Sequence, residues 1–353
     1  MSLIQQKFRQ HKAYRKPYLT FIVLLIGLIA FSIMAVGVGP VSISSSEVIR
    51  ILANKLGFIS FEDGELAQYQ AIVLSIRLPR VIIAILIGAT LAVTGAALQG
   101  LFRNPLADPT LIGVSSGSAL AAACVIVFGV NLGVLLPLAA FIGGLGATYL
   151  VYLISSKAGK TSVTTMLLAG IAINALAAAG IGYLIFNADD NQIRDLTFWT
   201  LGSISGATWE VVYKSAPFLI ISCIGLPFFS KQMNVMLLGE NEAKYLGIDT
   251  ERVKKVIIFL SALGIGAAVA VSGIIGFVGL VVPHLLRLII GPDHRFLIPN
   301  SILLGALLLL ASDLFARMAV IPAELPIGIV TSTIGAPFFL WLLIRNKSLS
   351  NFL

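Results

Sequence analysis

The segment from Arg77 to Gly117 contains two uncharged runs joined by one short polar turn. The first run, residues 81–102, is long enough to cross a lipid bilayer as a helix. The chain turns at Arg103-Asn104-Pro105 and continues at once into a second apolar run. Because a water-soluble domain does not place so much uncharged sequence on both sides of a short turn, this segment predicts a helical hairpin embedded in a membrane.

Composition extends this interpretation to the whole chain. The 353 residues are 58% hydrophobic and 11% charged, whereas soluble domains carry about 25% charged residues. We therefore predict an all-α, polytopic membrane protein whose single domain spans residues 1–353. The net charge of +8 resides in short loops, which favours membrane orientation over nucleic-acid binding. Cys124 and Cys223 lie in apolar runs and indicate no disulfide framework.

The apolar runs predict ten membrane-spanning helices, at residues 18–39, 81–102, 111–129, 134–155, 163–186, 209–230, 256–273, 276–291, 297–316 and 325–344. The first run is longer than the core of a signal peptide, so we expect it to be retained, with the basic residues 1–17 in the cytoplasm. The split near residues 273–276 leaves two short halves, one of which could be tilted, broken or re-entrant. An even number of spans places both termini in the cytoplasm, and the Lys and Arg residues then gather on that side.

A short sequence echo suggests an internal repeat. Ala92–Gly95 and Ala270–Gly273 have nearly the same sequence, and in each copy a proline follows ten residues after the glycine. The first copy lies at the end of the second predicted span and the second copy at the end of the seventh, so the copies lie five spans apart and run in opposite directions. This is the arrangement of an inverted transporter repeat, although so short a match could also arise by chance.

Three polar segments are expected outside the bilayer. Residues 40–80 form an outer segment with an amphipathic helix near Ser46–Leu56, which Ser46 caps. Residues 231–255 form an inner loop of two short helices separated by Gly247, which acts as a C-cap. We interpret this loop as a handle for a soluble partner, and a solvated connector is the alternative. Residues 189–195 are expected to form a solvated outer turn.

Three arginines are predicted on the outer side, against the overall charge bias. Arg77 and Arg80 flank Leu78-Pro79, and Arg317 follows the ninth span. Together they predict a rigid basic rim that would attract an acidic protein surface. Simpler explanations are interfacial snorkelling and, for Arg317, an ion pair with Asp313 one helical turn earlier.

Several motif matches do not indicate catalysis. Gly113–Gly117 fits the G-x-S-x-G hydrolase elbow, but it opens an apolar helix and has no suitable base, so close helix packing is favoured. Gly159-Lys160-Thr161 lacks the first glycine of a phosphate loop, so any ATP must be held by another chain. His284 and His294 have no Cys or carboxylate at ligand spacing, which argues against a metal site.

The combined motifs resemble the FecCD family, the permease subunits of type II ATP-binding-cassette importers for iron–siderophores, haem and cobalamin. The matching segments are R-L-P-R at 77–80, G-A-A-L-Q-G-L-F-R-N-P-L-A-D-P-T-L-I-G-V-S-S-G at 95–117, F-W-T-L-G-S-I-S-G-A-T-W at 198–209, L-G-E-N-E-A-K-Y-L-G at 238–247, G-F-V-G-L-V-V-P-H-L-L-R at 276–287 and E-L-P-I-G-I-V-T-S-T-I-G-A-P-F-F-L-W at 324–341.

This resemblance implies a homodimeric permease in the bacterial inner membrane, with ten spans in each copy. Its implied partners are two cytoplasmic ATPase subunits, which hold ATP and Mg, and a periplasmic substrate-binding protein; the chain itself would bind no cofactor and no nucleic acid. The binding-protein docking residues of the family fall on Arg77, Arg80 and Arg317. Those that couple to the ATPase fall on Leu238, Gly239, Glu240, Ala243, Lys244, Leu246 and Gly247. The pathway gate falls, by position, on Val163, Thr164 and Leu168.

Two motifs bear on the substrate. N-P-L-A-D-P-T-L-I-G-V-S-S-G and F-W-T-L-G-S are most similar to the haem branch of the family. We therefore expect a permease that imports an iron chelate, most similar to haem permeases, with ferric siderophore or cobalamin as alternatives. An ion-gradient-driven transporter would need carboxylates within the spans, and the spans carry almost none. An intramembrane hydrolase and a purely structural membrane subunit are further alternatives.

Overall fold

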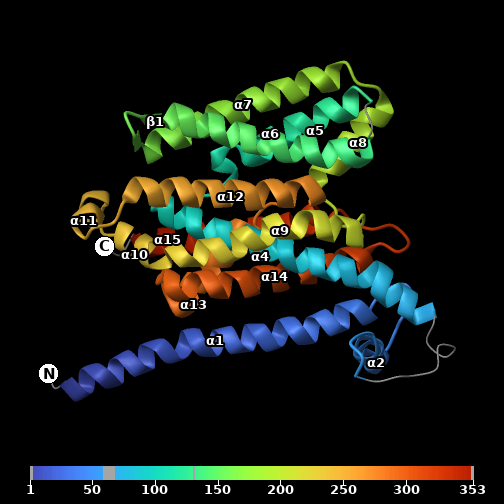
Figure 1. Ribbon diagram of the computed structural model, residues 1–353, viewed down its shortest axis with the longest axis horizontal. Helices are drawn as coiled ribbons and strands as arrows, with labels where there is room; N and C mark the ends of the chain where they lie inside the picture. Colours follow the sequence, from blue (N-terminus) through green and yellow to red (C-terminus); the bar gives the residue numbers. More distant parts are fainter. Residues whose placement is uncertain (1–2, 59–67, 130–131, 351–353) are drawn as a thin grey trace.

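The computed structural model describes residues 3–58, 68–129 and 132–350, and these residues are almost entirely helical. Strands are confined, within these ranges, to one hairpin of β1 (Ser156–Lys157) and β2 (Lys160–Thr161). Figure 1 shows long helices lying side by side, with shorter elements at both ends of the bundle. The expectation of an all-α protein is confirmed.

In the described residues ten apolar helices build the bundle, and each of the ten predicted ranges overlaps one of them. They are α1 (Leu3–Gly37), α4 (Leu78–Phe102), α5 (Val114–Val127), α6 (Leu132–Ser155), α7 (Val163–Phe186), α9 (Trp209–Gly225), α12 (Thr250–Ser272), α13 (Val278–Ile290), α14 (His294–Ala319) and α15 (Ile327–Ser350). Within the described ranges, seven are long and apolar enough to cross a membrane, and α5, α13 and the apolar part of α15 are shorter.

Shorter helices and turns connect these long elements. They are α2 (Ser45–Lys55), the π-helical turn η1 (Ile72–Arg77), the 3₁₀ turns η2 (Pro109–Ile112) and η3 (Leu226–Phe229), α8 (Asp190–Leu201), α10 (Ser230–Met236) and α11 (Glu240–Tyr245). The expected solvated turn near residue 190 is instead the start of α8. Asp189 and Gln192 form a capping box there and satisfy the free N–H groups at the start of the helix.

Two predicted boundaries in the outer segment 40–80 are wrong. The helix that leads into α4 begins at Gln68, so the span extends through η1 well before residue 81. The amphipathic helix near Ser46–Leu56 is present as α2, but Ser44 caps it rather than Ser46. Ser44 is the N-cap because Glu47 lies three residues later and completes a capping box with it.

Helix α4 lies at the centre of the bundle. In its most apolar stretch 83% of the residues are buried, against 72% for α12 and only 17% for α1. Helix α4 contacts α9, α12, α13 and α14, while α5, α6, α7 and α8 form a layer on the far side of α12 (Figure 1). Helix α1 lies on the opposite side of the molecule, against α14.

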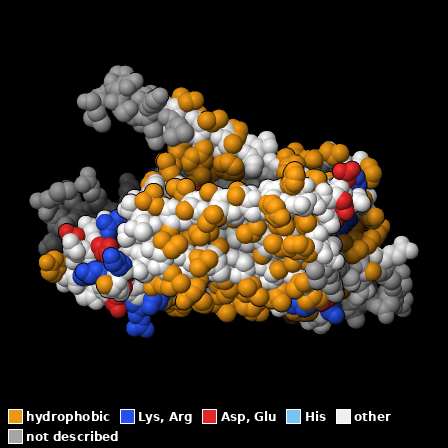
Figure 2. Space-filling model, turned by 90° about the horizontal axis from the view of Figure 1, so that it is seen from above, with side chains coloured by type: hydrophobic (Ala, Val, Ile, Leu, Met, Phe, Trp, Pro, Cys, Tyr) orange, Lys and Arg blue, Asp and Glu red, His pale blue; other side chains and the backbone are white. Residues whose placement is uncertain are grey.

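The two ends of the bundle carry most of its charged residues. In Figure 2 the visible Lys, Arg, Asp and Glu side chains gather at the two ends, and the surface between them is largely apolar. The start of α1, the β1–β2 hairpin, α10 and α11 lie at one end, whereas α2 and α8 lie at the other (Figure 1). This distribution is typical of a protein that spans a lipid bilayer.

Glycines allow the central helices to approach backbone to backbone. Gly88 lies against the carbonyl group of Gly305, and Gly95 lies against that of Gly279. Gly117, the last glycine of the G-x-S-x-G match, packs in the same way on Gly143. The packing interpretation of that motif is therefore confirmed.

Corresponding helices in the two halves of the chain each pack on helices of the other half. Helix α4 packs on α14 and α13, and α12 packs on α6 and α5 in the corresponding way. The glycines of the sequence echo do not occupy matching places, however. Gly273 is the C-cap of α12, whereas Gly95 lies within α4, before the end of that helix at Phe102.

We expect Gly95→Ala to destabilise the protein by about 1–3 kcal/mol, because the added Cβ would collide with the carbonyl group of Gly279. The thermal midpoint in detergent measures this effect. Gly146→Ala in α6 is the matched control, since no atom of another residue lies near the Cβ position of that glycine. Equal midpoints for the two variants would contradict the close approach of α4 and α13.

Candidate partner-docking sites and transport pathway

Arg77 is buried directly before the first residue of α4, where it binds the end of α1. Its Nη1 donates hydrogen bonds to the carbonyl oxygens of Val36, at 2.8 Å, and Gly37, at 2.7 Å. Its Nη2 donates to the carbonyl oxygen of Val41. The side chain therefore satisfies carbonyl groups that the end of α1 leaves without helical partners.

Arg80 lies one turn further along and bridges two carboxylates. Its Nε and Nη2 donate to Asp313 Oδ1 at 3.0 and 2.8 Å. Its Nη1 and Nη2 also donate to the two carboxylate oxygens of Glu324, at 3.0 and 2.9 Å. Arg317 Nε lies 3.1 Å from Asp313 Oδ2, so Asp313 pairs with two arginines.

We call Arg77, Arg80, Arg317, Asp313 and Glu324 the outer arginine cluster. The three arginines do come together at one end of the molecule, and the expected Asp313–Arg317 pair is present. The cluster is largely buried, because only 11% of the Arg80 side chain and 7% of the Arg317 side chain are accessible. Three positive and two negative charges leave the cluster with a net charge of +1. Glu324, with 39% of its side chain accessible, is its most open charged group.

The inner loop 231–255 is structured, as expected, but its subdivision differs. Gly247 caps α11 with φ of +81°, and Ile248 N–H donates to the Ala243 carbonyl, which is the predicted C-cap. A further break at Gly239, with φ of +146°, separates α10 from α11. The loop therefore contains α10, α11 and the first turn of α12 in place of two helices.

The coupling residues expected from the family motif form an exposed surface around α11. Leu238 and Leu246 are 70% and 64% exposed, and the neighbouring Tyr245 is 90% exposed. Ala243 is fully buried and anchors the helix to the bundle. Lys244 Nζ lies 3.7 Å from Glu240 Oε1 on the same helix. Three large apolar side chains at a charged, water-facing end need a partner surface to cover them.

The expected gate residues lie at the first turns of α7, directly after the β1–β2 hairpin. Val163 is partly buried, Thr164 is exposed and Leu168 is 63% exposed. Further along α7 some exposed residues are small, namely Ala172, Ala175, Ala178, Ala179 and Gly182. Others are large and apolar, namely Ile171, Leu176, Tyr183 and Phe186.

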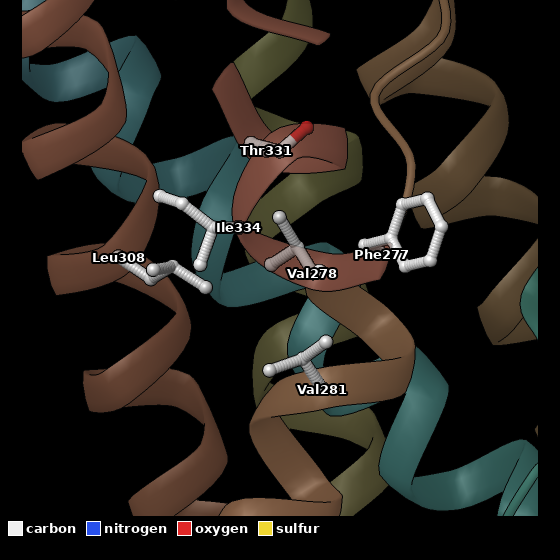
Figure 3. Close-up of a pocket in the computed structure, with 7 residues that line it drawn as sticks. Phe277, Val278, Val281, Leu308, Thr331 and Ile334 are labelled. Carbon is white, nitrogen blue, oxygen red and sulfur yellow. The ribbon is translucent and has the colours of Figure 1, made fainter. Parts of the chain in front are cut away.

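A small apolar pocket lies where the chain between α12 and α13 is not helical. In Figure 3 Val278, Leu308 and Ile334 point towards one another from α13, α14 and α15. Thr331 also lines the pocket, but its hydroxyl group already donates to the carbonyl oxygen of Gly328 at 3.2 Å. No charged group lines the pocket, so we interpret it as loose packing beside a helix break.

Metal-binding side chains do not gather in the described ranges. No three His, Cys, Asp or Glu residues of these ranges lie close enough together to hold a metal ion. His284 lies near the rings of Phe338 and Phe339, at 6.2 and 6.3 Å between centroids. His294 is buried and pairs with Asn234 at 2.8 Å, so the two histidines have separate surroundings.

Three relatives of known name share most of this chain. It is 47% identical over 279 residues to a hemin transport system permease protein from Yersinia pestis, and the match covers 78% of this chain and 83% of that protein. It is 43% identical to a cobalamin import system permease protein from Halobacterium salinarum, over 78% and 73% of the two chains. It is 38% identical to an Fe(3+)-citrate import system permease protein from Bacillus subtilis, over 93% and 96%.

A solved structure and a family profile agree with these relatives. The structure, titled as an inward-facing conformation of a putative metal-chelate type ABC transporter, superposes with a TM-score of 0.81 at 33% identity, over 92% of this chain and 98% of that one. The profile of the FecCD transport family matches residues 24–345. The chain therefore belongs to the FecCD transport family.

Proposed function

We propose that this chain is the membrane permease of an ATP-binding-cassette importer that carries haem into the cytoplasm. The observation that carries the proposal is the α11 surface, where Leu238, Tyr245 and Leu246 are exposed on a chain that has no phosphate loop. Homologues of this chain are permease subunits, and a separate ATPase hydrolyses ATP for them. An importer permease for an iron chelate, haem or cobalamin is the function of this family.

Haem is proposed over its alternatives because the hemin permease of Yersinia pestis shares 47% identity with this chain. Ferric citrate, a siderophore and cobalamin remain the alternatives, and relatives named for citrate and cobalamin share 38% and 43% identity. An ion-gradient-driven transporter is disfavoured because Asp313, a rare buried carboxylate within a long apolar helix, is already paired with two arginines.

The topology that we propose places residues 1–17, residues 231–255 and both termini in the cytoplasm of a bacterial inner membrane. Residues 40–80 then lie outside, and all 353 residues form one permease domain of ten spans. The exchanged contacts of α4 and α12 support an inverted repeat. Two copies of the chain would form the pathway, with the small residues of α7 facing the two-fold axis and Val163, Thr164 and Leu168 at its inner gate.

Reconstitution tests the central proposal. The chain is placed in vesicles with its ATPase and its binding protein, and haem, ferric citrate and cobalamin are offered in turn. We expect haem uptake that requires ATP and stops when the ATPase is omitted, because this chain holds no nucleotide site. Uptake driven by an ion gradient without ATP would favour the secondary transporter, and uptake of another substrate alone would correct the assignment of haem.

Cross-linking tests the proposed dimer. In a background without Cys124 and Cys223, we expect Leu168→Cys to form disulfide-linked dimers under oxidation, since Leu168 is 63% exposed on the proposed axis face. Leu19→Cys on α1 is the control; it is 59% exposed but lies on the other side of the molecule. Non-reducing gels measure the linked fraction. Equal cross-linking at the two positions would contradict the axis assigned to α7.

The docking role of Arg77, Arg80 and Arg317 remains part of the proposal, with a modified mechanism. An acidic group of the binding protein would compete with Glu324 for Arg80, because Glu324 is the accessible carboxylate of the outer arginine cluster. We expect Glu324→Gln to strengthen docking of the binding protein in a pull-down or titration. Glu210→Gln is the control, since this exposed carboxylate pairs only with Lys214. Weaker docking of the Glu324→Gln variant would rule out this competition.

A further inference from the structure

Lys254 is a buried cation at the end of the bundle that carries α11. It lies in the first turns of α12, and only 1% of the residue is accessible, which makes it one of the largest fully buried residues in the described part of the chain. Burial of an ammonium group is costly unless its donors are all used. Lys254 Nζ has three acceptors, at 2.9, 2.5 and 3.0 Å.

These acceptors come from three different parts of the chain. The first is the carbonyl oxygen of Thr161 in strand β2, and the second is Oε1 of Glu240, the first residue of α11. The third is Oε1 of Glu251, which lies on α12 itself. Lys254 therefore joins the coupling helix to the β1–β2 hairpin across the base of α12.

Glu251 also binds Thr161 of the hairpin. Its Oε2 accepts a hydrogen bond from the Thr161 N–H at 2.8 Å. Both backbone polar groups of Thr161 are thus bound by side chains of α12. Because Ser162 caps α7 and Val163 is its first residue, Thr161 lies directly before the start of that helix.

The pairing with Glu240 is an ionic one. Partial burial raises the pKa of the Glu240 carboxyl, but the hydrogen bond from Lys254 and the positive charges of Lys254 and Lys244 together lower it further, so the net pKa is below its ordinary value. Glu240 stays ionised at neutral pH for this reason. Lys244, on the same helix, lies 3.7 Å from the same carboxylate oxygen. Within this network the positive charges of Lys244 and Lys254 balance the negative charges of Glu240 and Glu251.

We propose that Lys254 is a positioning residue that transmits movement of α11 to the start of α7. The inference rests on the proposed function, in which the partner ATPase presses on the exposed surface of α11. A displacement of Glu240 pulls on Lys254, and Lys254 and Glu251 together carry it to Thr161 and to the hairpin. Thr164 and Leu168, in the first turns of α7, then move with the hairpin, so ATP hydrolysis and the proposed gate are linked through one buried side chain.

The variant Lys254→Met replaces the ammonium group by an uncharged, unbranched side chain that is one atom shorter. In the full complex in vesicles, we expect ATPase activity and assembly to persist while substrate transported per ATP falls on the order of tenfold. Lys254→Arg, which restores a cation, is expected to recover part of this ratio. Lys255→Met is the matched control, because Lys255 is the exposed neighbour on the same turn. Normal transport per ATP in Lys254→Met would overturn the proposal.

A spin label is attached at Lys160→Cys in the hairpin, in the background without Cys124 and Cys223. The response of its mobility to nucleotide provides a readout that a change in stability alone would not alter. We expect nucleotide to change the label's mobility in the otherwise unchanged complex and not in the Lys254→Met complex. If Lys254→Met does not assemble, Glu240→Gln decides. This variant weakens the link between Lys254 and α11, together with the pair between Lys244 and Glu240 within α11, and it leaves Lys254 paired with Glu251. If the hairpin responds to nucleotide in both Lys254→Met and Glu240→Gln, the proposed link from α11 through Lys254 is overturned. Absence of ATP-dependent uptake in the unmodified complex would instead count against the proposed function.

Discussion

The bundle depends on backbone contact at the centre of an apolar environment. A helix buried on all sides in a membrane gains little from the hydrophobic effect, because lipid tails are as apolar as its neighbours. Helix α4 compensates with glycines at the points where α13 and α14 cross it, which bring main chains together and increase dispersion contacts. The shape of the molecule is therefore set by small residues, and the large aliphatic side chains mostly fill the space around these crossings.

The two charged networks lie at opposite ends of the bundle and differ in what they connect. At the outer end Arg77 and Arg317 hold the end of α1, and Arg80 joins α4 to α14 through Asp313. At the inner end Lys254 joins α11, α12 and the hairpin before α7. Each network connects elements that are far apart in sequence. The first fixes helices to one another, and the second lies where a partner would act on the chain.

The sequence predicted the helices better than it predicted their charged contacts. Uncharged runs mark the apolar helices directly, and a glycine such as Gly247 marks a cap, because both depend on local composition and backbone geometry. The burial of Arg80 depends on Asp313 and Glu324, more than 200 residues later, and no local pattern reports such a pairing. Lys254 was missed for the same reason: in sequence it is one more cation in a basic loop, and only the fold surrounds it with Glu240 and Thr161.

The contacts of α1 have a consequence for how the protein is made. This helix leaves the ribosome before α14, yet its main contacts are with α14, and Arg317 donates to Ala35 from 282 residues further along the chain. This docking surface does not exist until α14 has been synthesised. Products truncated before α14 would therefore carry an inserted α1 without its main packing partner.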